Sequence, residues 1–113
     1  MFYITNAFSL NMIEGDADLH IRQVSIEDAS VLASVAESAV GHADTAAVFA
    51  DVLDVPVPCN RVTLTLNTGD LALVGQYSGP RLPEGATTLP EGATIKWMIV
   101  GVFRPSLEGL VDD

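Results

Sequence analysis

The order of the apolar segments along the chain constrains the fold most. Phe2–Thr5 is a short apolar run, and Leu19, Ile21 and Val24 alternate with polar residues, so each predicts a strand. Residues with helical spacing follow, and strand-like segments then return. Strands interleaved with helices are typical of α/β domains in which helices pack on a sheet. We therefore expect a mixed sheet of about five strands flanked by helices.

Two helices are predicted in the first half of the chain. Ser25 with Asp28 three residues later resembles a capping box, and predicts a helix that runs to about Ala39 and is ended by Gly41. A second helix follows and stops before Pro56. Its apolar face consists of Ala46, Phe49, Ala50 and Leu53.

The second half predicts a hairpin and a final strand. Arg61–Leu66 alternates apolar and polar residues, Asn67–Asp70 is a turn signal, and Leu71–Tyr77 is the expected returning strand. Ile95–Phe103 predicts a last, fully buried strand. We expect the acidic segment after Pro105 to be loosely held.

Composition limits the classes of function. The 113 residues predict one domain spanning 1–113, about half apolar, with a net charge of −10. Such a charge disfavours general binding to long nucleic acid or to an anionic membrane. Cys59 is the only cysteine, which excludes an internal disulfide and fits a cytoplasmic protein. No signal peptide is evident, and the longest apolar run, Trp97–Phe103, is too short to span a bilayer.

A repeated hexapeptide lies before the last strand. LPEGAT begins at Leu82 and again at Leu89, but only the first copy follows an arginine, Arg81. Arg81 and Glu84 are three residues apart and close enough to pair. The segment is either a salt-bridged loop stiffened by proline or a loop with catalytic side chains.

Three further stretches are polar where the fold does not require it. Asn6, Ser9 and Asn11 follow the first strand, where α/β sheets often bind ligands, although turn formation explains them as well. His42 lies at or just before a helix N-terminus, where free N–H groups favour a phosphate; the alternative is a surface or capping histidine. Arg61 offers a planar fork for phosphate, or else forms a surface ion pair.

Taken together, the stretches TNAFSLNM, GHADT, NRV and QYSGPRLPEG resemble, in that order, the small viral anti-CRISPR ring nucleases and their cellular relatives. The resemblance implies a homodimer that cleaves cyclic tetra-adenylate, the second messenger of type III CRISPR immunity, without a metal or other cofactor. It implies that His42 is the general acid and that Arg81 and Glu84 complete the catalytic set. The ligand-contacting positions that it implies are Asn6, Ser9, Asn11, Arg61 and Gln76.

The residue types agree with that chemistry. RNA carries its own nucleophile, the 2′-hydroxyl, so the protein has to supply a proton donor and a cation for the phosphoryl oxygens. Because only Glu84 follows an arginine, we expect it to be functional and Glu91 of the second copy to be structural. Two other functions remain open: a module that binds cyclic oligoadenylate without cutting it, and a structural protein of a virus or mobile element.

Overall fold

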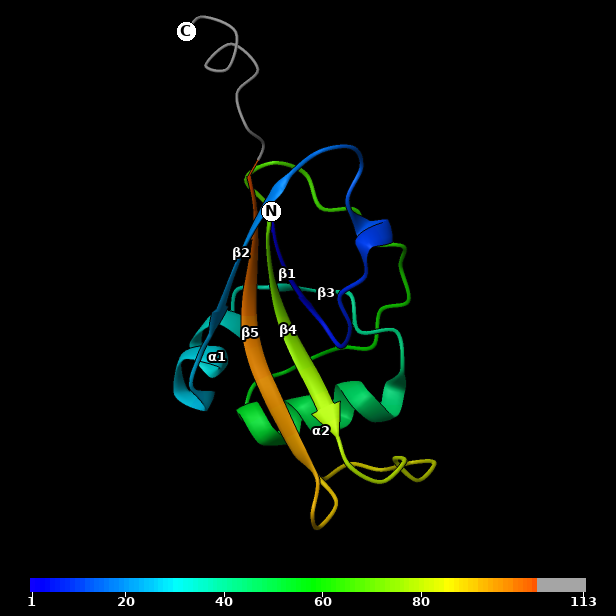
Figure 1. Cartoon of the computed structure of the whole chain (residues 1–113). Helices are drawn as coiled ribbons and strands as arrows, with labels where there is room; N and C mark the ends of the chain where they lie inside the picture. Colours follow the sequence, from blue (N-terminus) through cyan, green and yellow to red (C-terminus); the bar gives the residue numbers. More distant parts are fainter. Residues whose placement is uncertain (104–113) are drawn as a thin grey trace, which may run out of the picture.

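The computed structural model describes residues 1–103 (Figure 1). The prediction of a loosely held acidic tail concerns residues that lie outside this range. No helix in residues 1–103 is long and apolar enough to cross a membrane.

A single mixed sheet forms the centre of the fold, as the sequence predicted. Its five strands lie in the order β2-β5-β4-β1-β3. β1 pairs in parallel with β3 and with β4, whereas β5 pairs antiparallel with β4 and with β2. The strands are β1 (Phe2–Thr5), β2 (Asp18–Gln23), β3 (Glu37–Ser38), β4 (Leu71–Ser78) and β5 (Thr94–Phe103).

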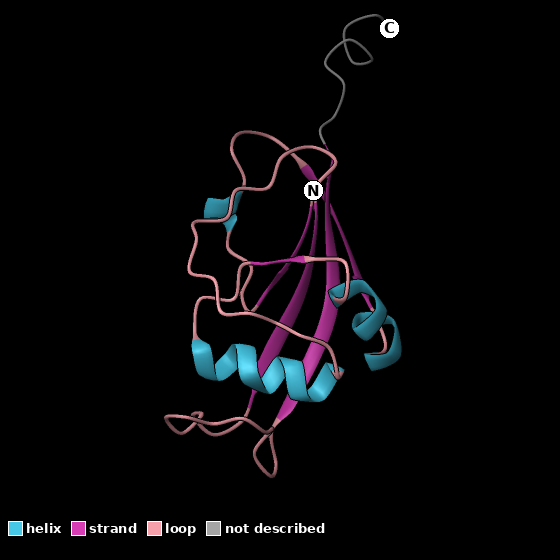
Figure 2. Ribbon diagram, turned by 180° about the vertical axis from the view of Figure 1, so that it is seen from behind, coloured by secondary structure: helices cyan, strands magenta, loops and turns pink. Residues whose placement is uncertain are grey.

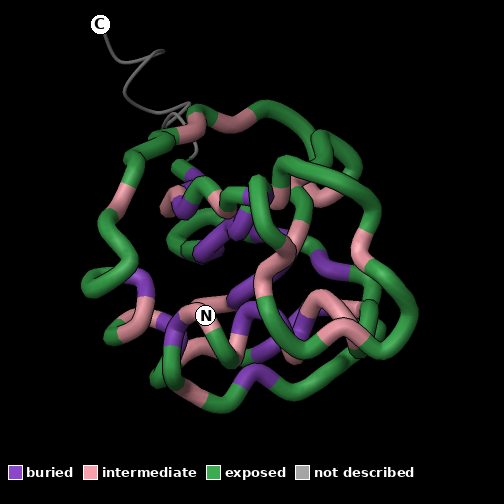
Figure 3. Tube along the Cα trace, turned by 90° about the horizontal axis from the view of Figure 1, so that it is seen from below, coloured by how far each residue is buried: buried purple, intermediate pink, exposed green. Residues whose placement is uncertain are grey.

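The two faces of the sheet are covered differently. α1 (Ile26–Ala33) and α2 (Ala43–Leu53) pack on one face (Figure 2). Loop residues cover the other face, near the short 3-10 helix η1 (Leu10–Met12). Alternation along the strands divides the core between the faces, since Leu73 faces the helices while Ala72 and Val74 face the loops. Seen from below, the buried segments gather inside a rim of exposed loops (Figure 3).

The first helix is shorter than predicted. The Ser25 hydroxyl caps it by accepting a hydrogen bond from the Asp28 N–H at 3.1 Å, as the capping box predicted. The helix ends at Ala33, however, and not near Ala39. The reason is strand pairing: Glu37–Ser38 forms β3 on the edge of β1, and the Ala39 N–H donates to the Ile4 carbonyl at 2.8 Å.

The predicted hairpin of Arg61–Leu66 with Leu71–Tyr77 is wrong. Residues 61–66 form no strand, because β4 is already hydrogen-bonded on one side by β1 and on the other by β5. The alternation still predicted side-chain burial, since Leu64 and Leu66 are buried in the loop-covered core. The predicted last strand is correct within one residue, but only part of it is buried.

A close contact fixes α2 against the second half of β4. The rings of Phe49 and Trp97 meet edge to face, with centroids 4.8 Å apart. They lie over Gly75, where a Cβ would come within 2.6 Å of both rings. Only glycine permits this approach, so Gly75 sets how near α2 lies to β4 and to the loop that follows it.

Candidate functional site

His42 lies where the sequence predicted, at the N-terminus of α2. It is the N-cap residue with extended backbone, and its side chain makes no capping hydrogen bond. The first helical bond runs from the Ala46 N–H to the His42 carbonyl at 2.9 Å. The imidazole is therefore available at the positive end of the helix, beside N–H groups that have no partner within the helix.

A neighbouring segment brings Arg61 to the same helix end. The Asn60 N–H donates to the Val40 carbonyl at 2.8 Å, and the Arg61 Nε–H donates to the Gly41 carbonyl at 3.3 Å. Gly41 directly precedes His42. Arg61 is thus held beside the backbone that leads into α2, and its remaining N–H groups can contact an anion there.

The two LPEGAT copies fold into the same turn. The Ala86 N–H donates to the Pro83 carbonyl at 3.0 Å, and the Ala93 N–H donates to the Pro90 carbonyl at 3.1 Å. The glycine of each copy has a positive φ, 79° in the first and 82° in the second, as a turn of type II requires. We call them the first PEGA turn (residues 83–86) and the second PEGA turn (residues 90–93).

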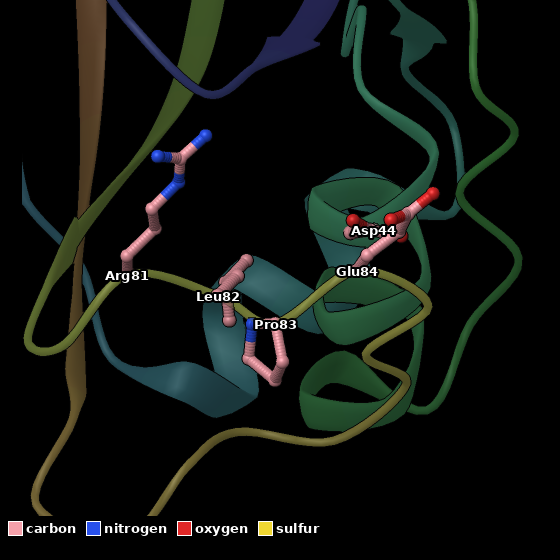
Figure 4. A pocket seen from close by; sticks show the side chains of 5 residues that line it. All are labelled: Asp44, Arg81, Leu82, Pro83 and Glu84. Atoms are coloured by element: carbon pink, nitrogen blue, oxygen red, sulfur yellow. The ribbon is translucent and has the colours of Figure 1, made fainter.

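Two adjoining clefts lie between α2 and this loop. The histidine cleft has a volume of about 510 Å³, and the glutamate cleft has a volume of about 480 Å³ (Figure 4). Residues of the histidine cleft are His42, Asp44, Thr45, Tyr77, Gly79, Arg81 and Leu82. Residues of the glutamate cleft are Asp44, Arg81, Leu82, Pro83 and Glu84. The fold thus brings Arg81 together with His42 on one side and with Glu84 on the other.

Arg81 and Glu84 do not form the ion pair that their spacing allows. Among residues 1–103, the N-terminus forms an ion pair with Asp70, in which neither Arg81 nor Glu84 takes part. Figure 4 shows the Arg81 side chain extending away from the loop, while the Glu84 side chain lies at the other end of the labelled segment, near α2. Both charged groups are exposed, so the guanidinium is available to an anion.

None of the predicted ligand-contacting residues, Arg61 included, lines either of the two clefts. Asn6 follows β1, and the Ser9 hydroxyl accepts a hydrogen bond from the Asn11 N–H at 3.2 Å to cap η1. This contact agrees with the turn-forming alternative for that stretch. Gln76 is exposed on β4, but alternation places it on the opposite face from Tyr77, which lines the histidine cleft.

Three polar residues of the histidine cleft had no role predicted from the sequence, namely Asp44, Thr45 and Tyr77. The Asp44 Oδ1 accepts a hydrogen bond from the Gly85 N–H at 3.0 Å, which joins α2 to the first PEGA turn. The Tyr77 hydroxyl donates to the Pro80 carbonyl at the start of the loop. An acidic residue in the first turn of a helix is a common stabilising feature, so Asp44 gave no distinct signal.

Tyr3 on β1 has a shifted pKa. Burial, aided by the negative charges of Asp70 and Glu37, raises the pKa of the Tyr3 phenol. No group of three His, Cys, Asp or Glu side chains in residues 1–103 could hold a metal ion.

Comparisons with known proteins identify similar chains in archaeal viruses. The model of a family described as STIV B116-like matches residues 2–96. An uncharacterized protein of Sulfolobus islandicus filamentous virus (isolate Iceland/Hveragerdi) is 35% identical over 88 residues, which cover 75% of this chain and 74% of the viral protein. B116 of Sulfolobus turreted icosahedral virus has a similar structure, with a TM-score of 0.77 and 28% identity, covering 88% of this chain and 97% of that one.

These matches correct the family suggested by the four motifs. The motifs resembled viral anti-CRISPR ring nucleases, whereas the family that matches nearly the whole described chain is STIV B116-like. The assignment to a ring nuclease family is therefore wrong.

Proposed function

The chain belongs to the STIV B116-like family, and from its clefts we propose that it cleaves a small cyclic oligoadenylate without a metal ion. The observation that carries the proposal is that His42 and Arg81, far apart in sequence, line one cleft at the N-terminus of α2. Transfer at a phosphodiester needs a proton donor and positive groups for the phosphoryl oxygens. The histidine cleft supplies the imidazole, the guanidinium and the free N–H groups of the helix.

The charge distribution supports a small ligand. A net charge of −10 disfavours a long polyanion, while Arg61 and Arg81 give this region a local positive potential. The volume of the histidine cleft, about 510 Å³, lies within the roughly 300–1,000 Å³ of small-ligand sites. A compact ring of nucleotides can use these positive groups while keeping clear of the acidic surface.

The proposed reaction is an internal transesterification. The 2′ oxygen of one nucleotide forms a bond to the adjacent phosphorus as the bond from phosphorus to the 5′ oxygen breaks. Protonated His42 donates its proton to the departing 5′ oxygen, and Glu84 accepts the proton of the 2′-hydroxyl. Arg81 stabilises the negative charge on the phosphoryl oxygens. The product is a linear strand that ends in a 2′,3′-cyclic phosphate.

The substrate that we propose is cyclic tetra-adenylate, bound between two copies of the chain. A homodimer presents two histidine clefts to a ring with matching two-fold symmetry, so two cuts give two linear di-adenylates. Cyclic tetra-adenylate is the messenger of type III CRISPR immunity. Its removal by a protein of a virus would have an anti-CRISPR effect, which agrees with the viral origin of the relatives.

The test is incubation of the purified protein with cyclic tetra-adenylate in excess EDTA, with mass spectrometry of the products. Transesterification adds no water, so each di-adenylate product should have half the mass of the ring. His42→Ala should slow cleavage roughly 10²–10⁴-fold, the usual contribution of a general acid. The matched control is His20→Ala, because His20 is the other histidine of the chain and packs on Phe103, outside both clefts.

Each contrary result has a definite meaning. Equal rates for His42→Ala and the wild type would remove His42 from the mechanism, and loss of activity in EDTA would contradict metal independence. A ring that binds but stays intact would indicate a protein that sequesters or senses the nucleotide. A ring that neither binds nor raises the melting temperature would favour a structural protein of a virus or mobile element.

A further inference from the structure

Asp44 is the residue through which α2 holds the loop that carries Arg81 and Glu84. Its Oδ1 accepts the Gly85 N–H at 3.0 Å, across a long separation in sequence. Within residues 1–103, this is the hydrogen bond that joins the first PEGA turn to α2. The other hydrogen bonds of the loop among residues 1–103 are local, namely the two turn bonds and the bond from the Tyr77 hydroxyl to the Pro80 carbonyl.

The position of Asp44 links the two clefts. Asp44 lies two residues after His42 in the first turn of α2, and it lines both the histidine cleft and the glutamate cleft. Gly85 directly follows Glu84 in the first PEGA turn. The hydrogen bond therefore ties the backbone beside Glu84 to the helix turn that begins at His42.

The charge of Asp44 makes it an unexpected neighbour for an anionic ligand. A carboxylate in the first helical turn stabilises the helix, but it also lowers the positive potential that a phosphate would use. The presence of a carboxylate here, in spite of its repulsion of an anion, is explained if its oxygen is needed as a hydrogen-bond acceptor. On this basis we infer that Asp44 is a positioning residue, which sets Arg81 and Glu84 against His42 through the Gly85 N–H.

This inference rests on the proposed function for its kinetic consequence, and on the Asp44–Gly85 contact for its structural one. Asp44→Asn keeps a side-chain oxygen acceptor and removes the charge, whereas Asp44→Ala removes both. With cyclic tetra-adenylate, Asp44→Ala should lower kcat roughly tenfold or more with little change in KM, because the reacting groups are less well oriented. Asp44→Asn should keep kcat near the wild-type value and lower KM, because it removes repulsion of the anion.

A second measurement needs no nucleotide. In ¹⁵N relaxation of the free protein, the Gly85 amide should become more mobile in Asp44→Ala but not in Asp44→Asn. The Gly92 amide, in the matching second PEGA turn, should be unchanged in both variants. Unchanged Gly85 dynamics in Asp44→Ala would overturn the inference even if the wild-type protein cleaves no ring.

The kinetic outcomes also separate the explanations. Wild-type kcat in Asp44→Ala would overturn the positioning role, and an equal loss in Asp44→Asn would assign the effect to charge and not to the hydrogen bond. If wild-type protein leaves the ring intact while Gly85 responds as expected, the proposed function fails and the positioning of the loop by Asp44 stands.

Discussion

Asp70 lies at the amino end of β4 and joins that strand to the start of the chain. Its carboxylate accepts hydrogen bonds from the Asn67 N–H at 2.9 Å and from the N-terminal ammonium at 3.1 Å. Burial alone would raise the pKa of Asp70, but these two donors together lower it below its usual value. The charged carboxylate is therefore stabilised in the folded state.

The lowered pKa predicts how stability responds to acid. Between the folded and the unfolded pKa values the unfolded chain binds more protons, so this contribution is fully present above roughly pH 4 and is lost as the pH falls through the folded value. Asp70→Asn should lower the free energy of unfolding by roughly 1–3 kcal/mol at pH 7. Urea unfolding at pH 7 and pH 3 gives the difference in the free energy of unfolding between the wild type and Asp70→Asn. This difference should be smaller at pH 3, and a difference that stays the same at both pH values would contradict the assignment.

Among the elements, the repeated loop shows how one sequence motif serves two surroundings. Both PEGA turns have the same hydrogen bond and the same positive φ at glycine, so the repeat itself is explained by turn formation. They differ in what surrounds them. The first turn contacts Asp44 and lines a cleft with Arg81, whereas the second leads directly into β5.

The repeat provides a matched pair of variants. Glu84→Ala and Glu91→Ala remove the same side chain from the same turn, so melting temperatures should change equally and little. Only Glu84→Ala should slow cleavage of cyclic tetra-adenylate, roughly 10²-fold or more for loss of a general base. Initial rates for both variants check this prediction, and equal loss in the two would assign glutamate a role in the turn only.

For the molecule as a whole, the proposed dimer has to form against its own charge. Each chain carries −10, so two copies repel at low ionic strength. The proposed ligand is also an anion, which makes the local positive groups at the N-terminus of α2 more important. Added salt screens the repulsion between the two acidic chains over their whole surface.

Association should therefore strengthen as salt is added. Sedimentation equilibrium should give twice the mass of one chain, with a dissociation constant that falls as NaCl rises, because added ions screen the repulsion between two acidic chains. A single-chain mass at every protein concentration and salt concentration would contradict the homodimer. Tighter association at low salt would show that attraction between opposite charges dominates the interface.

Much of the fold follows from local sequence. Phe2–Thr5, the Ser25 cap and the second helix were predicted at or near their observed places, because strand alternation, capping and helical spacing are local properties. The same reasoning placed His42 at a helix N-terminus. It failed for residues 61–66, because alternation reports which side chains are buried and does not reveal whether a neighbouring strand edge is free.

The sequence by itself determined several of the elements, such as β1, α2 and β5, together with the acidic charge and the types of residue available for chemistry. Only the tertiary structure decided which of those residues meet, placing Arg81 beside His42 and leaving Gln76 on the far face of β4. It also revealed the contact of Asp44 with Gly85, which no spacing predicts. The physical reason is that strand order and the close packing of Phe49 and Trp97 over Gly75 set where α2 lies, and both depend on contacts between residues distant in sequence.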